Sequence, residues 1–570
     1  MLPAHLKRYV VEQDYSRYTP VDQEVWRYIM RQLIDFLSKH AHPCYNAGLE
    51  KTGIEVDRIP EIKKMSEKLE RFGWRAVPVS GFIPPAAFME LQALGYLPIA
   101  SDMRSVDHLL YTPAPDIVHE AAGHAPILIE PEYAGYLRAY AQVARKAIIS
   151  KSDMDQYEAI RVLSDLKEDP SSTNEQIRAA EKQLEEVTAN IKHISEAALL
   201  SRMNWWTAEY GLIGTLDSPK IFGAGLLSSV GEAQACLQPK VKKIPLTIDC
   251  VNYSYDITEP QPQLFVTPSF GHLVTVLEEL AAMMAFRLGG VQGLEKAKLA
   301  ETPNTVELNS GVQISGRLKE YQVCDGQPAY IQFEGRTQIC LDHQELPGHG
   351  GDYHVHGFGS PVGFLEGESK CLSEMNEAEL KRLGVVVDGR TELKFANGTR
   401  VKGQVMGWLR APTGQLMVIS FRECTVTREG RTLFDPAWGI FDMTVGSRVV
   451  SVFGGPADRL AYGETDDFVA RLIPRKVWPA HIQEKHRLYQ EIRDLRENAS
   501  GDFSSRLEKA YSDLQSKFPE DWLARLSLLE LSHKNHDNRL RATLETELRA
   551  LERKDELTRK LVEDGLRVMA

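Results

Sequence analysis

The sequence predicts a mainly α-helical core, followed by a small antiparallel β module and a helical C-terminal module. Apolar residues near the N-terminus recur three and four positions apart, which is the spacing of an amphipathic helix. Alternating residues flank Asn397-Gly398, a dipeptide typical of tight β-hairpin turns. Helical spacing returns towards the C-terminus. We therefore expect three consecutive parts, residues 1–304, 305–465 and 466–570.

The composition of the chain argues against several classes of protein function. The chain has 570 residues and a formal net charge of -12, which argues against general nucleic-acid binding because phosphate-binding proteins usually display a basic face. The 7 cysteines include no Cys-x-x-Cys pair, so reduced thiols are expected. The N-terminus lacks the apolar core of a signal peptide, and no apolar run approaches the roughly 20 residues that span a bilayer. We expect a cytoplasmic protein without a membrane partner.

The first predicted element is a helix over residues 21–40. Its apolar stripe consists of Val21, Val25, Ile29, Leu33 and Phe36. One face of this helix should pack against the core.

A candidate metal site follows in residues 104–124. Pro113 and Pro115 favour an extended approach, and Asp116 stands where a helix N-cap would accept amide hydrogen bonds. The helix that it begins carries His119 and Glu120.

The second histidine, His124, follows His119 by five positions, so the spacing is not the His-Glu-x-x-His of zinc proteases. An offset of five turns a side chain by about 140° on an ordinary α-helix. The two imidazoles therefore converge only if the helix ends or bulges near Gly123. The best third ligand is Glu209, and two histidines with one carboxylate leave metal positions open, as in non-haem Fe(II) sites.

Three separated motifs then carry a resemblance. They are Tyr111-Thr-Pro-x-Pro-Asp-x-x-His-Glu-x-x-Gly-His-x-Pro, Trp206-x-x-Glu-x-Gly-Leu, and Gly223-Ala-Gly-Leu-Leu-Ser-Ser-x-Gly-Glu232. The chain resembles the pterin-dependent aromatic amino acid hydroxylases, bacterial phenylalanine 4-hydroxylases in particular, over roughly residues 12–290. This resemblance implies their fold in the core, Fe(II), tetrahydrobiopterin or another reduced pterin, and O2.

The resemblance also implies roles for individual residues. His119, His124 and Glu209 would hold the iron, and Glu120 matches a carboxylate near both iron and pterin. Arg104 matches the arginine that grips the substrate carboxylate through two parallel hydrogen bonds. The other matched substrate positions are Tyr111, Thr112, Pro115, Trp205, Gly225, Ser228, Ser229 and Ile257, and the pterin positions are Gly81, Phe82 and Phe88. A buried Phe88 that only fills the core is the simpler interpretation of that residue.

The implied reaction is hydroxylation of L-phenylalanine to L-tyrosine, a step of phenylalanine catabolism. Ile257 occupies a position that distinguishes substrates across the family, and it is not the acidic residue of tyrosine hydroxylases. Tryptophan remains an alternative substrate. Two further classes of protein fit the same ligand set, namely a zinc hydrolase that uses Glu120 as its base and a non-catalytic pterin-binding scaffold.

A long segment separates His124 from Glu209, and its pattern predicts an inserted helical hairpin over about residues 151–200. Ser172 to Glu175 fits a capping box for the second arm. That arm carries an apolar seam from Ile177 to Ala198 and should run on into the helix bearing Glu209. The seam packs either on its own chain or on a second copy.

Hairpin turns are predicted at Asn397-Gly398, at 412–414 and at Glu429-Gly430. In the C-terminal module, Phe518-Pro519 should separate two helices, and helix pairs of this kind suggest docking or self-association. The β module also contains His343, His349, His354 and His356. On a strand, His354 and His356 would share one face and could bind a second metal.

Overall fold

The computed structural model describes residues 2–81, 83–109, 116–168, 172–255, 260–463, 478–498, 502–534 and 536–569. The chain forms two compact units. The first contains Met1–Ala139, Asn204–Val274 and Val469–Ala570, and the second contains Tyr140–Met203 and Thr275–Phe468. This division differs from the three consecutive parts expected from the sequence in two respects. The C-terminal helices belong to the N-terminal unit, and residues 140–203, which include the predicted hairpin, belong to the unit of the β-rich region.

Helix α1 (Pro20–His40) organises the first unit and agrees with the helix predicted over residues 21–40. Thr19 caps it by accepting a hydrogen bond from the Asp22 amide, and the Asp22 carboxylate accepts one from the Thr19 amide. Pro20 suits the first turn because that turn needs no amide donor. The predicted apolar stripe is buried at its centre, at Ile29 and Leu33.

Two small sheets belong to the same unit. Strands β1 (Arg75–Val79) and β2 (Tyr96–Ala100) pair in parallel, joined through α4 (Pro85–Ala93). The second sheet has the order β4-β3-β6-β5. Its strands are β3 (Leu212–Gly214), β4 (Pro219–Ile221), β5 (Lys242–Pro245) and β6 (Gln263–Thr267). The remaining helices are α2 (Cys44–Thr52), α3 (Ile62–Leu69), α9 (Ala224–Leu227) and α10 (Val230–Cys236), with α5 (Pro131–Ala144) and α11 (Phe270–Ala282) extending into the second unit. Short 3₁₀ turns lie at Ala4–Tyr9, Tyr15–Arg17, Glu70–Phe72, Val106–His108, Ala125–Ile129 and Ile248–Asn252.

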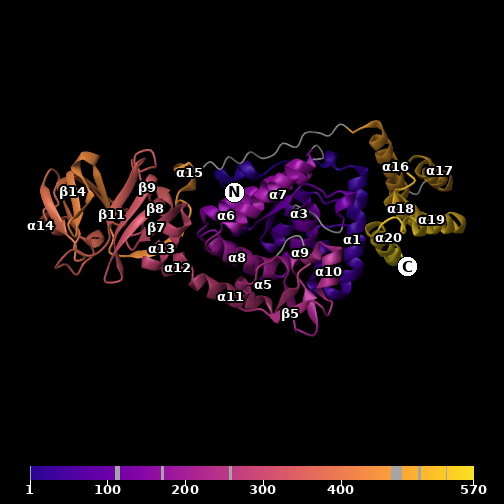
Figure 1. Ribbon diagram of the computed structural model, residues 1–570, viewed down its shortest axis with the longest axis horizontal. Coiled ribbons are helices and arrows are strands. Elements are labelled where there is room, and N and C mark those ends of the chain that lie inside the picture. The colour runs from indigo at the N-terminus through magenta and orange to yellow at the C-terminus, as the bar shows by residue number, and fades with distance from the viewer. Residues whose placement is uncertain are drawn as a thin grey trace. The chain divides into compact units, whose positions relative to one another are not determined.

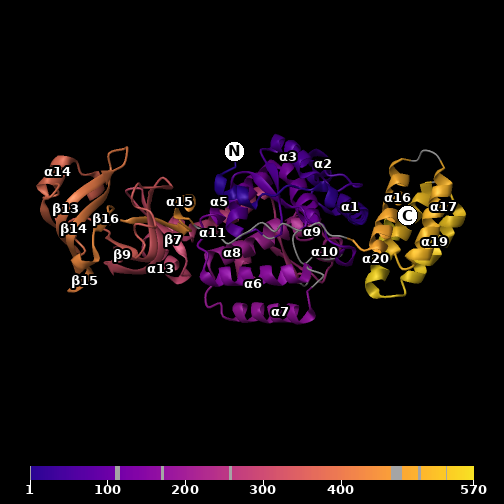
Figure 2. The same ribbon diagram turned by 90° about the horizontal axis from the view of Figure 1, so that it is seen from above.

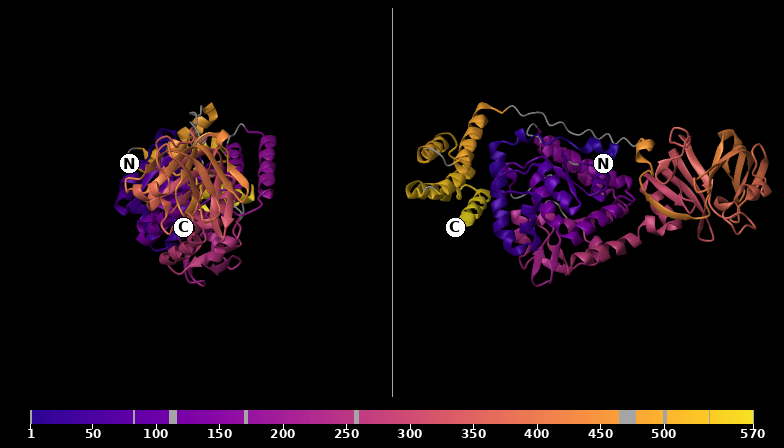
Figure 3. Two further views of the ribbon diagram at one scale, coloured as in Figure 1. Left: turned by 90° about the vertical axis from the view of Figure 1, so that its left-hand side faces the viewer. Right: turned by 180° about the vertical axis from the view of Figure 1, so that it is seen from behind.

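The C-terminal module is entirely helical where the structure describes it (Figure 3, yellow). Its helices are α16 (Ala480–Glu497), α17 (Phe503–Lys517), α18 (Trp522–Lys534), α19 (Asn538–Leu551) and α20 (Glu556–Met569). Phe518-Pro519 lies between α17 and α18, as predicted.

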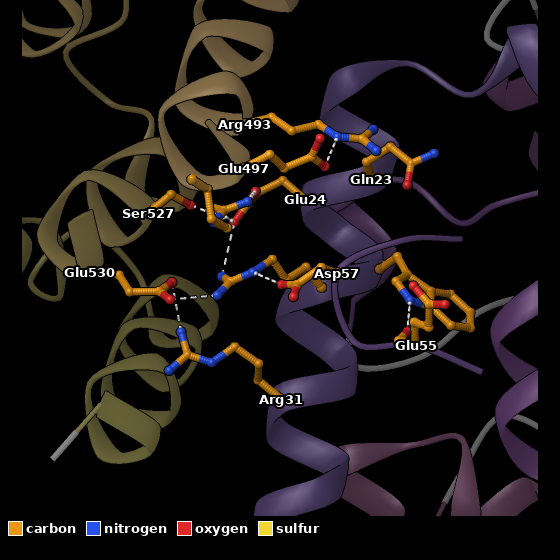
Figure 4. Close-up of polar contacts among 12 residues, drawn as sticks. Gln23, Glu24, Arg31, Glu55, Asp57, Arg493, Glu497, Ser527 and Glu530 are labelled. Atoms are coloured by element: carbon orange, nitrogen blue, oxygen red, sulfur yellow. Dashed lines mark hydrogen bonds and ion pairs between the residues drawn. The ribbon is translucent and has the colours of Figure 1, made fainter. Parts of the chain in front are cut away.

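Buried charges join these helices to α1 (Figure 4). Arg496 of α16 donates to both oxygens of Glu24 at 2.8 and 3.0 Å, and the Ser527 hydroxyl donates to Glu24 at 2.7 Å. Arg27 and Arg31 both donate to Glu530, at 2.5 and 2.9 Å. Burial alone would raise the pKa of Glu24, but Arg496 and Arg27 hold it below its usual value. The carboxylate is therefore ionised inside this interface.

The second unit contains the helical hairpin and the β-rich region. Helices α6 (Lys151–Glu168) and α7 (Asn174–Ala189) lie side by side (Figure 2). The capping box of α7 consists of Thr173 and Gln176, so the prediction of Ser172 and Glu175 was wrong by one residue. The second arm also ends at Ala189, and α8 (Glu196–Asn204) begins a new helix. It does not run on unbroken into the segment that carries Glu209.

The β-rich region contains two antiparallel sheets (Figure 1). In the first, the order is β10-β9-β8-β7-β17, and β11 also pairs with β9. Its strands are β7 (Pro303–Leu308), β8 (Val312–Cys324), β9 (Gln327–Leu341), β10 (Gln344–Glu345), β11 (Gly357–Pro361) and β17 (Val449–Gly454). The second has the order β12-β13-β14-β15, with β16 on β14, and contains β12 (Arg390–Lys394), β13 (Arg400–Arg410), β14 (Leu416–Arg428), β15 (Arg431–Phe434) and β16 (Phe441–Thr444). Short helices α12 (Ala285–Leu288), α13 (Gly290–Ala300), α14 (Glu377–Arg382) and α15 (Arg459–Tyr462) and 3₁₀ turns at Leu372–Glu374 and Pro436–Trp438 complete the unit.

The three predicted hairpin turns connect consecutive strands of the second sheet. Glu429 and Gly430 have φ of 51° and 77°, the left-handed values that a two-residue type I′ turn requires. Each sheet has its own apolar core, represented by Ile314 and Ile331 in the first and by Phe421 and Phe441 in the second. In the described part of the chain, no helix combines the length and apolar character needed to cross a bilayer.

We expect Arg496→Met to lower the free energy of unfolding by on the order of 3 kcal/mol at neutral pH, because it leaves the buried Glu24 carboxylate without its main partner. Since the pKa of Glu24 is lowered on folding, this stabilisation is present above the usual glutamate pKa and is lost as pH falls through the lowered value. Urea unfolding of the unaltered protein and Arg496→Met at neutral and acidic pH measures the difference.

Arg541→Met is the control: it removes an exposed helical ion pair to Glu545 and should change the free energy of unfolding by less than about 0.5 kcal/mol. Equal effects of the two substitutions would contradict a stabilising role for the buried pair.

Candidate metal centre

Both segments that carry the predicted ligands are π-helical. His119 and His124 lie on η5 (Val118–His124), where the Ala125 amide bonds to the Glu120 carbonyl five residues earlier. This wider turn brings side chains five apart onto one face, so the ring centroids of the two histidines are 5.0 Å apart. Of the two alternatives that the spacing left open, an end or a bulge of the helix near Gly123, the structure has the bulge, and it extends over the whole segment.

Glu209 ends the second π-helix, η7 (Trp205–Glu209), where the Tyr210 amide bonds to the Trp205 carbonyl at 2.8 Å. One carboxylate oxygen lies 3.3 Å from His119 Nε2, and the other lies 3.3 Å from His124 Nε2. Asn204 donates a further hydrogen bond to Glu209 at 3.3 Å. The three predicted ligands therefore converge.

A close helix contact positions η5. A β-carbon added at Gly123 would lie 2.6 Å from the carbonyl oxygen of Ala224 in α9, a distance that requires backbone to move. Tyr45 supports the same segment by donating from its hydroxyl to the Ala122 carbonyl at 3.1 Å. Glycine at position 123 thus lets α9 approach the metal-ligand helix.

Ser228, next to α9, sets the tautomer of His119. Its hydroxyl donates to the Ala224 carbonyl at 2.7 Å, so its oxygen is left to accept from His119 Nδ1 at 3.1 Å. In the neutral imidazole Nδ1 then carries the proton, and Nε2 is the nitrogen left to bind a metal. This is the arrangement in which an imidazole binds a metal through Nε2.

The pKa values of the two glutamates of the site, Glu209 and Glu120, are shifted in opposite directions. Burial would raise the pKa of Glu209, but His124 and His119 hold it well below the usual value. Burial raises the pKa of Glu120 to about 8, and its Oε2 has no hydrogen-bond partner among the described residues. Glu120 also offers an oxygen within 4.8 Å of ligand atoms of His119 and His124. Glu209 is the better third ligand because each of its oxygens faces one imidazole nitrogen.

Arg104 is joined to the centre through Asp116. Its Nε and Nη2 donate to the two Asp116 oxygens at 2.6 and 2.7 Å, and both side chains are buried. Asp116 also accepts from the His119 amide at 3.1 Å, so it caps the helical turn that begins at Ile117 and leads into η5. The pairing with Arg104 was not predicted, although both residues lie in the segment 104–124.

The other predicted positions fall into two groups. Trp205 stacks on Tyr210 and Tyr255 with centroid distances of 4.5 and 4.3 Å, and Gly225 lies against Tyr210 and the Glu209 carbonyl. Ser229 caps α10, the Gly81 amide donates to Asp102 at 3.3 Å, and Phe88 is half-buried on α4. Phe82, Tyr111, Thr112, Pro115 and Ile257 lie outside the described residues. Tyr255 was missed because stacking between distant aromatic residues leaves no periodic signal.

Comparison with known proteins identifies the family. Residues 8–157 and 176–289 match the model of the biopterin-dependent aromatic amino acid hydroxylases. The phenylalanine-4-hydroxylase of Mesorhizobium japonicum is 30% identical over 269 residues, which cover 46% of this chain and 81% of that protein. The phenylalanine-4-hydroxylase of Chromobacterium violaceum is 28% identical over 307 residues, covering 53% and 88%. A crystal structure of the latter enzyme with oxidized Fe(III) is 26% identical, covers 48% of this chain and 86% of that chain, and gives a TM-score of 0.38.

The chain belongs to the biopterin-dependent aromatic amino acid hydroxylase family. It is therefore an aromatic amino acid monooxygenase. The family match omits residues 158–175, which include the end of α6 and the connection to α7.

We expect Gly123→Ala to lose most of its bound metal while the rest of the chain stays folded, because the new methyl group would force η5 away from α9. Metal analysis after dialysis and thermal unfolding measure the two effects. Gly135→Ala is the matched control, since a β-carbon there meets no atom within 4 Å. Unchanged metal content in Gly123→Ala would show that the close contact does not position the ligands.

Proposed function

We propose that the protein hydroxylates L-phenylalanine to L-tyrosine with O2 and a reduced pterin, at an iron(II) ion held by His119, His124 and Glu209. The observation that carries this proposal is the placement of both Glu209 oxygens 3.3 Å from the two imidazole Nε2 atoms. Two imidazoles and a carboxylate on one side of a metal suit Fe(II) and leave positions for reactants. The phenylalanine-4-hydroxylase relatives, including one from Bos taurus that is 30% identical over 274 residues, support the substrate.

The residues around the centre fit this cofactor set. Ser228 presents the correct nitrogen of His119, and Glu209 is ionised and so brings negative charge to the cation. The unpartnered oxygen of buried Glu120 is available to a bound pterin. When bound, iron(II) and the reduced pterin supply the electrons that activate O2.

Arg104 is the proposed anchor for the substrate carboxylate. Asp116 uses the fork formed by Nε and Nη2, and among the described residues Nη1 has no hydrogen-bond partner. The outer fork of the guanidinium therefore remains for a second carboxylate. Asp116 also accepts from the His119 amide, so Arg104 and the main chain of His119 share one carboxylate partner. Trp205 and its stacked partner Tyr255 supply an aromatic wall on the Glu209 side.

We expect His119→Ala, His124→Ala and Glu209→Ala to remain folded, to retain little iron and to form no tyrosine, because each loses one of three ligands. Iron content and product formation are measured together, with phenylalanine, tryptophan and tyrosine offered separately. His536→Ala, on an exposed turn, is the control and should match the unaltered protein. Near-native turnover in His124→Ala would reject the ligand set, and preferential hydroxylation of tryptophan would reject the substrate assignment.

We expect Arg104→Lys to raise the KM for phenylalanine at least about tenfold, since a lysine cannot form a bidentate fork and a charged hydrogen bond contributes roughly 1.5–3 kcal/mol. Iron content should remain close to that of the unaltered protein. Steady-state kinetics at saturating pterin measure the change, and Arg71→Lys on the exposed surface is the control. An unchanged KM would mean that another group holds the carboxylate.

A further inference from the structure

A second group of metal-ligand side chains lies in the β-rich unit. His349, His354 and Asp442 are 7%, 9% and 5% exposed, and one ligand atom from each lies within 4.8 Å of the others. His349 Nδ1 and His354 Nε2 are 3.2 Å apart. Neither the hydroxylation chemistry nor the family match, which ends at residue 289, uses these residues.

Backbone hydrogen bonds to β9 place the two histidines. The Ile339 amide donates to the His349 carbonyl at 3.0 Å, and the Thr337 amide donates to the His354 carbonyl at 3.1 Å. The His354 amide also donates to the Gly350 carbonyl at 3.1 Å, which closes the loop between them. The main chain at both histidines is thus fixed to β9, which supports a preformed ligand pair.

The third residue comes from the other sheet. Asp442 lies on β16 opposite Ser420 of β14, and the Ser420 hydroxyl donates a short hydrogen bond to its Oδ1. Such a bond orients a ligating carboxylate. The cluster therefore spans a loop of the first sheet and a strand of the second.

The expected pair of His354 and His356 does not form. Residue 354 makes only an isolated bridge to Thr337, the chain turns immediately afterwards, and His356 is exposed. His343 is also exposed. The buried partner of His354 is instead His349, five residues earlier.

We propose that His349, His354 and Asp442 bind a second divalent transition-metal ion, which links the two sheets of the β-rich unit. Two nitrogens that are each about 2.0–2.1 Å from a tetrahedral zinc ion lie roughly 3.3 Å apart, close to the distance between these imidazoles. Imidazole and carboxylate ligands suit zinc and iron(II) alike. A bound cation would also offset the cost of burying the Asp442 carboxylate.

The test is metal stoichiometry in the full chain, stripped with chelator and titrated with Zn²⁺ alone. We expect two tight equivalents per chain for the unaltered protein, and one for each of Asp442→Asn, His349→Gln, His354→Gln and His119→Ala. The double variant His119→Ala/Asp442→Asn should bind none. His356→Gln is the matched control, an exposed histidine on the same loop, and should bind two.

Thermal unfolding supplies a second readout. Zn²⁺ should raise the Tm of His119→Ala, which keeps only the new site, and should leave the Tm of the double variant unchanged. Circular dichroism verifies that each variant is folded, and His349→Gln and His354→Gln replace Asp442→Asn if that variant fails to fold. If the unaltered protein binds one equivalent of Zn²⁺ and His119→Ala binds none, the proposal is overturned. His349 and His354 would then be only a hydrogen-bonded pair. Two equivalents retained in all three β-unit variants would overturn it as well.

Discussion

The contact between Gly123 and the Ala224 carbonyl is the constraint on which the candidate metal centre depends. It allows α9 to lie directly against η5, and α9 in turn supplies the carbonyl that fixes the Ser228 hydroxyl. Ser228 then determines which nitrogen of His119 faces Glu209. The missing side chain at Gly123 is thus connected, through Ala224 and Ser228, to a histidine of its own helix, because each step in this series is a short contact in a closely packed interior.

Much of this centre could be predicted from sequence because its ligands lie in dense local motifs. His119 and His124 could not converge on an ordinary α-helix, and that conflict predicted that the helix ends or bulges near Gly123. The π-helix that carries Glu209 could not be predicted in the same way. Only one predicted ligand lies in that segment, so there is no spacing between two ligands from which to infer the helix type. The Arg104–Asp116 pair escaped prediction for a different reason. Asp116 already had a sufficient local role as a helix cap, and its second role needs three-dimensional contact.

The fold was predictable where one local rule dominated. Type I′ turns need left-handed residues, so Glu429-Gly430 marked its hairpin correctly. The start of α7 was harder because Ser172 and Thr173 are both good caps and Glu175 and Gln176 are both good third residues, so pattern alone could not choose the register. No sequence pattern predicted that the C-terminal helices pack against α1. Glu24 and Arg27 look like solvent-facing residues in a helical pattern, and only their partners Arg496 and Glu530 explain their burial.

The discontinuous first unit has a consequence for the order of events during synthesis. Ribosomes make the chain from its N-terminus, and domains normally fold as their residues emerge. Here α1 is made early, yet Arg496 and Glu530, which pair with Glu24 and Arg27, lie on α16 and α18. Until those helices have been made, Glu24 lacks its ion pair with Arg496, and among the described residues Arg27 can pair only with Glu24 and Asp57. The first unit therefore reaches its finished form only after nearly all of the second has left the ribosome.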